Sequence, residues 1–92
     1  MAVEAKIQTK ILAFLKKEGF VADKIIVANK AGVLDIIACC PLGRYWSIEV
    51  KAPDGTESKL QEYRRKLLLK NKAKAFTCYS YEEFLSYYKK FS

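Results

Sequence analysis

Two carboxylates and one amine, at Asp35, Glu49 and Lys51, are the side chains of this sequence best suited to chemistry. Asp35 interrupts an otherwise apolar segment, and Glu49 and Lys51 are two residues apart, which places them on one face of an extended strand. Carboxylate oxygens are the ligands that Mg²⁺ and Mn²⁺ prefer, and an amine can stabilise negative charge beside them. The three residues therefore indicate hydrolysis of a phosphate ester assisted by a divalent metal.

A predicted hairpin brings the two carboxylates together. Pro41-Leu42-Gly43 is typical of a three-residue hairpin loop with glycine in the left-handed conformation. In that register Arg44 lies opposite Cys40, and Glu49 lies directly opposite Asp35, with Cβ atoms about 4.5–5.5 Å apart. Two carboxylates so close repel each other, and a divalent cation would offset the cost of placing them there.

The same three residues allow a purely structural interpretation. Asp35 would pair with Lys51 as an ion pair, and Glu49 would be solvated at a strand edge. The spacing alone does not decide between the two interpretations, because Glu-x-Lys is common in protein sequences.

Composition narrows the chemistry further. The chain has no histidine, which excludes Ser-His-Asp and Cys-His triads and histidine-ligated zinc. With 17 basic and 10 acidic residues the net charge is +7, which favours a polyanionic partner, nucleic acid first. Basic charge is densest over residues 59–74. No sequence feature indicates a nucleotide cofactor.

The length of 92 residues predicts a single small domain that would gain stability from a partner subunit or a bound metal. No apolar run approaches the ~18–20 residues of a membrane span. Lys6 and Lys10 interrupt any signal-peptide pattern, so we expect an intracellular protein with no membrane partner. Cys39 and Cys40 lie in an apolar run and are expected to be small buried hydrophobic residues in a reducing compartment.

Hydrophobic periodicity and turn residues predict an α/β fold in the order α-β-β-β-α-β-α, a mixed central sheet flanked by helices. The strand over residues 33–40 is almost continuously apolar and is predicted to be covered on both faces. Ser58 and Gln61 predict a capping box, with Leu60, Tyr63, Leu67 and Leu68 on the buried face of its helix. The predicted helices span residues 2–18, 58–70 and 80–91, and the predicted strands span residues 24–28, 33–40, 44–51 and 73–79.

Three segments together resemble the PD-(D/E)XK nuclease superfamily: Gly32-Val33-Leu34-Asp35-Ile36-Ile37-Ala38, Ile48-Glu49-Val50-Lys51, and Ser58-x-x-Gln61. Within it the chain looks like a stand-alone virus-type replication-repair nuclease (VRR-Nuc) domain, similar in pattern to archaeal-type Holliday-junction resolvases. The resemblance extends from Glu4 to about Phe84 and includes the element order. It implies a restriction-endonuclease-like fold and a setting in DNA repair or recombination, with a phage origin as one possibility.

The resemblance implies a role for each residue of the motif. Asp35 and Glu49 would ligate Mg²⁺ or Mn²⁺, the backbone carbonyl of Val50 would be a third ligand, and Lys51 would be the catalytic lysine. One departure is Leu34, which stands where the superfamily name has proline. Because proline there only shapes the backbone, we do not expect the departure to affect activity.

Two further residues are implied at the edge of the site. Glu4 would approach the metal through water, and Gln61 would contact a metal-bound water or the DNA. Each also has a structural interpretation, since acidic residues favour the first turn of a helix and Gln61 completes a capping box. Candidates for contact with DNA lie on the loop around residue 30 and on the helix over residues 58–70; they are Asn29, Lys30, Ser58, Lys59, Arg64 and Arg65.

Three functions follow as hypotheses. The first is a homodimeric Mg²⁺-dependent endonuclease that resolves four-way DNA junctions by attack of water, leaving 5′-phosphate and 3′-hydroxyl ends as the family does. The second is a monomeric flap or nicking endonuclease, which the oligomeric state in solution would distinguish from the first. The third is a non-catalytic DNA-binding module on the same fold, for which replacing Asp35 with Asn would leave behaviour unchanged.

Overall fold

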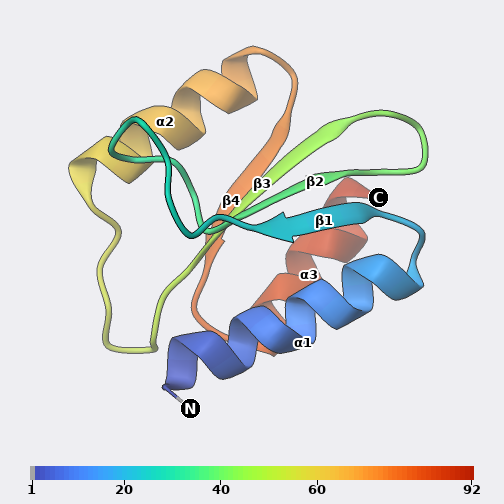
Figure 1. Cartoon of the computed structure of the whole chain (residues 1–92), viewed down its shortest axis with the longest axis horizontal. Coiled ribbons are helices and arrows are strands. Elements are labelled where there is room, and N and C mark those ends of the chain that lie inside the picture. Colours follow the sequence, from blue (N-terminus) through green and yellow to red (C-terminus); the bar gives the residue numbers. More distant parts are fainter. Residues whose placement is uncertain (1) are drawn as a thin grey trace.

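The computed structural model describes residues 2–92, which form three helices and four strands in the predicted order (Figure 1). The elements are α1 (Val3–Lys17), β1 (Val21–Lys24), β2 (Ile36–Cys39), β3 (Tyr45–Val50), α2 (Lys59–Lys70), β4 (Lys74–Cys78) and α3 (Tyr81–Phe91). Among residues 2–92 no helix is both long enough and apolar enough to cross a lipid bilayer.

The four strands form one mixed sheet in the order β1-β2-β3-β4. The first three strands run antiparallel, and β4 runs parallel to β3, which requires a crossover that α2 supplies. Helices α1 and α3 contact each other and cover one face of the sheet, whereas α2 lies on the other face over β3 and β4 (Figure 1). The prediction of a mixed sheet flanked by helices is therefore confirmed.

The β2–β3 hairpin has the predicted register. Ile36 pairs with Ile48 and Cys39 with Tyr45, and Gly43 adopts the left-handed conformation with φ of 82°. The Cys40 N–H donates to the Arg44 carbonyl at 3.0 Å and closes the turn. The register that sets Glu49 opposite Asp35 is thus the register of the fold.

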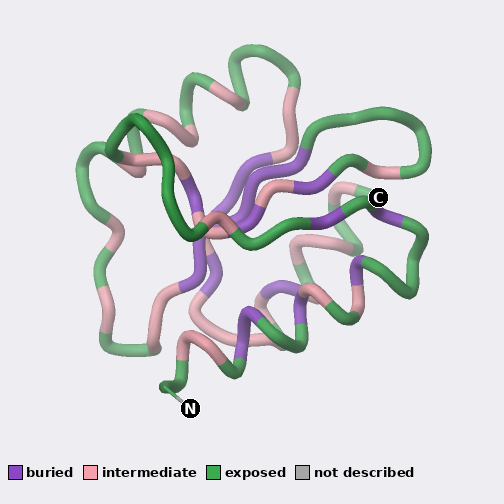
Figure 2. The backbone as a smooth tube through the Cα atoms, in the orientation of Figure 1, coloured by how far each residue is buried: buried purple, intermediate pink, exposed green. Residues whose placement is uncertain are grey.

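The hydrophobic core lies between the sheet and the α1–α3 pair (Figure 2). Ile11 and Leu15 of α1, Ile48 of β3 and Phe84 of α3 are completely buried there. The Phe14 ring meets the Phe84 ring edge-on, at a centroid distance of 5.5 Å. The aromatic residues near the C-terminus also pack against this core; they are Tyr81, Tyr87, Tyr88 and Phe91. Much of the aromatic surface near the C-terminus is therefore used inside the domain.

The prediction of the first strand over residues 24–28 was wrong. The strand is β1 and ends at Lys24, while Ile26 and Val27 are 86% and 88% exposed in the loop that follows. Buried Phe20 and Ala22 alternate with exposed Val21, which is the pattern of a strand. This pattern is short, and the more apolar segment that follows it misled the sequence prediction.

The predicted buried face of the helix over residues 58–70 was also wrong. Leu60, Tyr63 and Leu67 are 56%, 64% and 41% exposed. The partly covered positions of α2 are Gln61, Arg64, Arg65 and Leu68, which repeat at helical spacing. The helix faces polar side chains of the sheet and the preceding loop, so its inward face is itself largely polar.

Strand β2 is covered less completely than predicted. Ile36 and Ala38 are buried against the core, but Ile37 is only half-buried and Cys39 is exposed on the opposite face. Helix α2 covers β3 and β4 and does not reach this end of β2. The expectation that Cys39 is buried was therefore wrong, because an apolar sequence does not reveal how far a helix extends over the sheet.

Gly32 fixes the distance between the loop before β2 and the start of α2. Its φ is 87°, and a Cβ there would lie 2.7 Å from the Leu60 carbonyl oxygen. We expect Gly32→Ala to lower the free energy of unfolding by about 1–3 kcal/mol through backbone strain, with a further loss from the clash. Urea denaturation would measure it.

Gly43→Ala is the matched control for this prediction. Gly43 has a similar φ of 82°, but a Cβ there would meet nothing within 4 Å, so this variant reports backbone strain alone. Gly32→Ala should destabilise the chain more than Gly43→Ala does. Equal losses of unfolding free energy in the two variants would show that the close approach to Leu60 does not affect stability.

Candidate active site

Asp35 and Glu49 meet where the hairpin ladder ends. The Asp35 N–H donates to Glu49 Oε1 at 3.2 Å, and the Val50 N–H donates to Asp35 Oδ2 at 3.0 Å. Beyond the Ile36–Ile48 pair, side-chain oxygens thus replace backbone carbonyls as hydrogen-bond acceptors. The two carboxylates predicted to lie opposite each other are brought together and fixed by the backbone.

Local sequence explains why these acids share the face of the sheet opposite the core. Leu34 and Ile36 are completely buried and turn Asp35, between them, the other way. In β3, Ile48 and Val50 are buried in the core and leave Glu49 on the face of Asp35. The alternation that builds the core therefore also aims the acids.

Glu49 is the electrostatic centre of this arrangement. It is 2% exposed, and burial together with the negative charge of Asp35 raises its pKa from 4.5 to about 7. The Lys51 ammonium lies 3.5 Å from Glu49 Oε2 and opposes that rise without cancelling it. The cluster has more negative than positive charge, so an added cation would stabilise it.

The structural interpretation left open by the sequence does not describe this geometry. Lys51 pairs with Glu49 rather than with Asp35, and Glu49 is buried rather than solvated. A buried acid whose pKa is raised toward neutrality destabilises the folded chain at neutral pH, which is the opposite of a stabilising ion pair.

Glu4 reaches the same end of the sheet from α1. Its Oε1 accepts a hydrogen bond from the Ala52 N–H at 3.2 Å, directly after Lys51 in the chain. Within residues 2–92 no three His, Cys, Asp or Glu side chains are grouped closely enough to hold a metal, so the carboxylate ligands available are Asp35 and Glu49. The approach of Glu4 to a metal through water, and the Val50 carbonyl as a ligand, stay predictions.

Gln61 is occupied by helix capping. The Ser58 N–H donates to Gln61 Oε1 at 3.0 Å, and the Gln61 N–H donates to Ser58 Oγ at 3.1 Å. This confirms the predicted capping box. The close approach of Gly32 to Leu60 places this end of α2 beside the chain that leads into Asp35. A catalytic role for Gln61 stays a prediction.

The residues predicted to contact DNA divide into two groups. Asn29, Lys30, Ser58 and Lys59 are exposed, on a loop and a helix start that the Gly32–Leu60 contact brings together. Arg65 is instead directed inward, where Nε and Nη2 donate to the two Glu57 carboxylate oxygens at 2.9 and 3.1 Å. Its guanidinium is thereby committed to the fold, and the neighbouring Arg64 is only half-exposed.

Glu57 and Thr77 are neighbours of the site that sequence reasoning missed. Thr77 pairs with Glu49 in the parallel register, and its hydroxyl donates to Glu57 Oε1 at 2.7 Å. The hydrogen bond from Arg65 lowers the pKa of Glu57, so this acid stays ionised. No local sequence signal reveals the contact, since β4 joins β3 only through the crossover.

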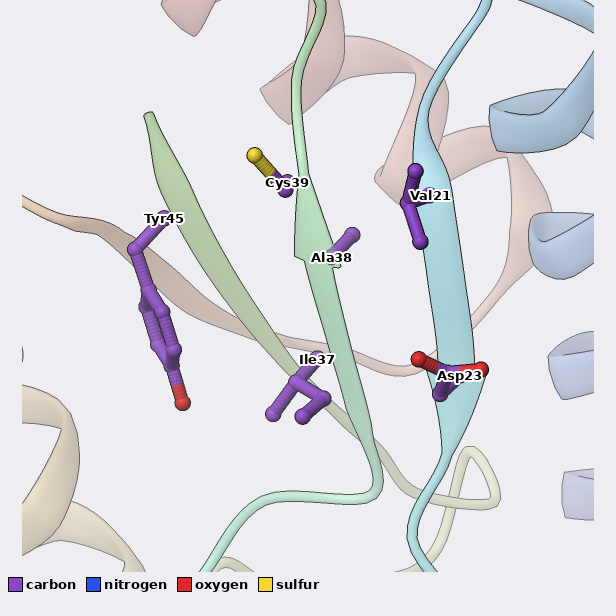
Figure 3. A pocket seen from close by; sticks show the side chains of 6 residues that line it. All are labelled: Val21, Asp23, Ile37, Ala38, Cys39 and Tyr45. Carbon is purple, nitrogen blue, oxygen red and sulfur yellow. The ribbon is translucent and has the colours of Figure 1, made fainter. Parts of the chain in front are cut away.

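The end of the sheet that α2 does not cover, here called the open part of the sheet, holds no cluster of charged side chains like that of Asp35, Glu49 and Lys51. A hollow of about 160 Å³ lies there between β1, β2 and β3 (Figure 3), and neither Glu49 nor Lys51 is among the residues that line it. Asp23 is the one charged residue among those lining it, with Val21, Ile37, Ala38, Cys39 and Tyr45. A single exposed carboxylate among apolar side chains provides no catalytic set.

A solved structure described as "VRR_NUC domain" superposes on this chain with a TM-score of 0.85, at 19% sequence identity. The match covers 97% of this chain and 97% of that chain. The chain has the fold of a VRR_NUC domain. Neither a protein-family model nor a curated protein matches the sequence. Because the match covers nearly the whole chain, α1, the β-hairpin and the crossover that position Glu4, Asp35, Glu49 and Lys51 are all parts of this shared fold.

Proposed function

We propose that this chain is a metal-dependent DNA endonuclease whose active site is Asp35, Glu49 and Lys51. The observation that carries the proposal is a pair of carboxylates, buried Glu49 and partly buried Asp35, with the amine of Lys51 beside Glu49. Asp35 and Glu49 are linked by two backbone hydrogen bonds, and Lys51 lies 3.5 Å from Glu49. A nuclease fold supplies the context in which such a cluster hydrolyses phosphodiesters.

The residues present fit a hard divalent cation. One oxygen of each carboxylate accepts a backbone N–H, which leaves Asp35 Oδ1 and Glu49 Oε2, the oxygen nearest Lys51, as possible metal ligands. The excess negative charge that raises the pKa of Glu49 is what Mg²⁺ or Mn²⁺ would neutralise. Bound there, the metal would polarise the scissile phosphate and lower the pKa of a water molecule.

The chain's own residues supply positioning and charge. The two backbone hydrogen bonds hold the carboxylates in fixed orientations, so they need not reorganise during the reaction. Lys51 is 20% exposed, which lets its ammonium contact a phosphate while Glu49 holds it in place. In that position the ammonium stabilises the negative charge that develops as the phosphodiester bond breaks. The products expected are 5′-phosphate and 3′-hydroxyl ends.

The preferred substrate is a four-way junction, cut by a homodimer. Such a junction is close to two-fold symmetric, and a C₂ dimer would place two active sites symmetrically upon it. The net charge of +7 supports binding of DNA in general, and exposed Lys30 and Lys59 lie on segments near Asp35. A small domain also gains stability from a partner subunit.

Cleavage of labelled substrates tests the proposal. A four-way junction, a linear duplex, a flap and a single strand would be incubated with Mg²⁺ or EDTA, with the oligomeric state measured by sedimentation. Paired symmetric nicks that need Mg²⁺, from a dimer, are the expected result. Cleavage of flaps or duplex by a monomer would keep the active site and overturn the junction substrate.

Asp35→Asn separates an enzyme from a binding module. The variant should bind junction DNA as tightly as the wild type or more tightly, because a negative charge is removed, and it should not cut. Binding without cleavage by wild type and variant alike, on every substrate and with every divalent metal, would overturn the endonuclease proposal in favour of a non-catalytic module.

A further inference from the structure

A second hollow lies beside the candidate active site and has no role in the chemistry proposed above. It has a volume of about 250 Å³ and is formed by the N-terminal half of α1, the segment after β3 and the start of α3. Its lining includes Lys6, Lys10, Pro53, Tyr79 and Tyr81. Aromatic rings interleaved with ammonium groups are typical of surfaces that bind nucleic acid strands.

Two chain connections place this hollow next to the active site. Val3, which lines the hollow, directly precedes Glu4, whose carboxylate binds the Ala52 N–H, and Pro53 directly follows Ala52. On the other side, the parallel pairing of β3 with β4 continues past the strand ends, because the Lys51 N–H donates to the Cys78 carbonyl at 3.0 Å. Tyr79, the next residue, therefore lies beside Lys51.

Tyr79 differs from the other aromatic residues around α3. Its backbone N–H is held by Glu83 Oε1 at 3.0 Å, so the residue is fixed at the end of β4. Its ring makes no ring–ring contact with any aromatic residue of the chain from residue 2 onward, although Phe76 and Tyr87, nearby, stack at 4.6 Å. The side chain also borders a separate hollow lined by Glu57 and Arg65. Tyr79 thus borders two hollows, and its ring has no aromatic partner among residues 2–92.

Charge around the hollow favours an anion. Lys6 and Lys10 are exposed, and the Lys10 ammonium lies 5.8 Å from the centroid of the Tyr81 ring. Glu82 is an exposed carboxylate in the same lining, so the two ammonium groups exceed it by one charge. The Tyr81 ring itself packs against Phe14 and Phe84, which leaves Tyr79 as the ring available for a ligand.

We propose that this hollow binds one unpaired nucleotide of the DNA next to the cleaved phosphodiester, with its base stacked on Tyr79 and its phosphate near Lys6 and Lys10. The inference rests on the proposed nuclease function and deepens it, since it makes an unpaired nucleotide part of what is recognised. The volume lies below the roughly 300–1,000 Å³ of sites that enclose drug-sized ligands, which suits a single base. Flaps and single strands offer such nucleotides directly, a four-way junction offers one where a base pair at its branch point opens, and an intact duplex offers none.

Binding in EDTA tests the subsite without cleavage. The probe is a thymidine oligonucleotide carrying one 2-aminopurine, whose fluorescence is quenched when the base stacks on an aromatic ring. Tyr79→Leu should weaken binding about tenfold and abolish the quenching, whereas Tyr79→Phe should retain both. Tyr45→Leu, on the open part of the sheet, is the matched control and should behave as the wild type.

The roles of Lys6 and Lys10 are tested separately, by the salt dependence of DNA binding. Lys6→Ala and Lys10→Ala should each reduce the slope of log affinity against log salt by about 0.7, as expected for loss of one contact to a single-stranded phosphate. An unchanged slope in both variants would overturn the placement of the phosphate.

Two results would overturn the stacking role while leaving the nuclease intact. One is wild-type affinity and quenching in Tyr79→Leu, and the other is an equal loss of affinity for duplex and single strand. If Tyr79→Leu does not fold, photocrosslinking of 5-iodouracil DNA to the wild-type chain decides: a crosslink at Tyr79 supports the subsite, and one elsewhere overturns it. Failure of the wild type to bind any DNA would overturn both this inference and the proposed function.

Discussion

Lys51→Ala is expected to reduce the rate of DNA cleavage about 10²–10³-fold, the usual cost of removing one group that stabilises developing charge. Lys51 is the one cation that the structure places beside Asp35 and Glu49, 3.5 Å from Glu49, among residues 2–92. Its loss would leave the negative charge of the transition state without this partner. Single-turnover cleavage at saturating DNA and Mg²⁺ measures the effect on the chemical step.

Lys66→Ala is the control for Lys51→Ala. It removes the same charge from an exposed pair with Glu62, where the side chains are 66% and 48% exposed. At saturating DNA its rate should match the wild type, because the lysine lies in solvent away from the carboxylates. A Lys51→Ala chain that cleaves as fast as Lys66→Ala would remove Lys51 from the mechanism.

Glu49→Gln is expected to stabilise the metal-free chain at pH 8 while abolishing cleavage. The pKa of Glu49 is about 7 in the folded chain and 4.5 ordinarily, so the folded chain binds this proton more tightly than the unfolded chain. The free energy of unfolding therefore falls as pH rises from about 4.5 to about 7, by at most about 3 kcal/mol. Glutamine carries no charge and escapes this loss.

Urea denaturation at pH 5 and pH 8 in EDTA measures the prediction for Glu49. The stability of the wild type should fall between the two pH values by more than that of Glu49→Gln does. Glu62→Gln is the matched control, because Glu62 is 48% exposed and its charge is already solvated. A Glu49→Gln chain that is less stable than the wild type at pH 8 would show that ionised Glu49 does not destabilise the fold.

The same variant links stability to metal. A divalent cation that binds Asp35 and Glu49 stabilises only the folded chain, so Mg²⁺ should raise the melting temperature of the wild type at pH 8. Glu49→Gln should lose most of that increase, since half of the carboxylate pair is gone. Equal increases in both proteins would place the bound metal elsewhere.

Much of the candidate site could be predicted because its signals are local. Pro41-Leu42-Gly43 sets the turn type, the turn sets the register, and the register sets Glu49 opposite Asp35. Capping of α2 by Ser58 and Gln61 is equally local. Each of these steps involves residues close in sequence, where steric and hydrogen-bonding rules hold without knowledge of the rest of the fold.

The sequence predictions were wrong where burial of a residue depends on coverage by an element that is distant in the sequence. Ile26 and Val27 are apolar but lie outside the sheet, and Leu60 is 56% exposed although it belongs to α2. Apolar composition indicates what can be buried, but burial also requires a partner surface. That surface is fixed by where the crossover places the helix.

The sequence by itself thus determined the order of elements, the hairpin register and the pairing of Asp35 with Glu49, since turn geometry and alternation are local. Only the tertiary structure decided that Lys51 pairs with Glu49, that Arg65 is held by Glu57, and that Thr77 and Tyr79 adjoin the site. These contacts depend on the parallel pairing of β4 with β3 after the chain has crossed over through α2. A long connection leaves no local sequence signal of the register that it sets.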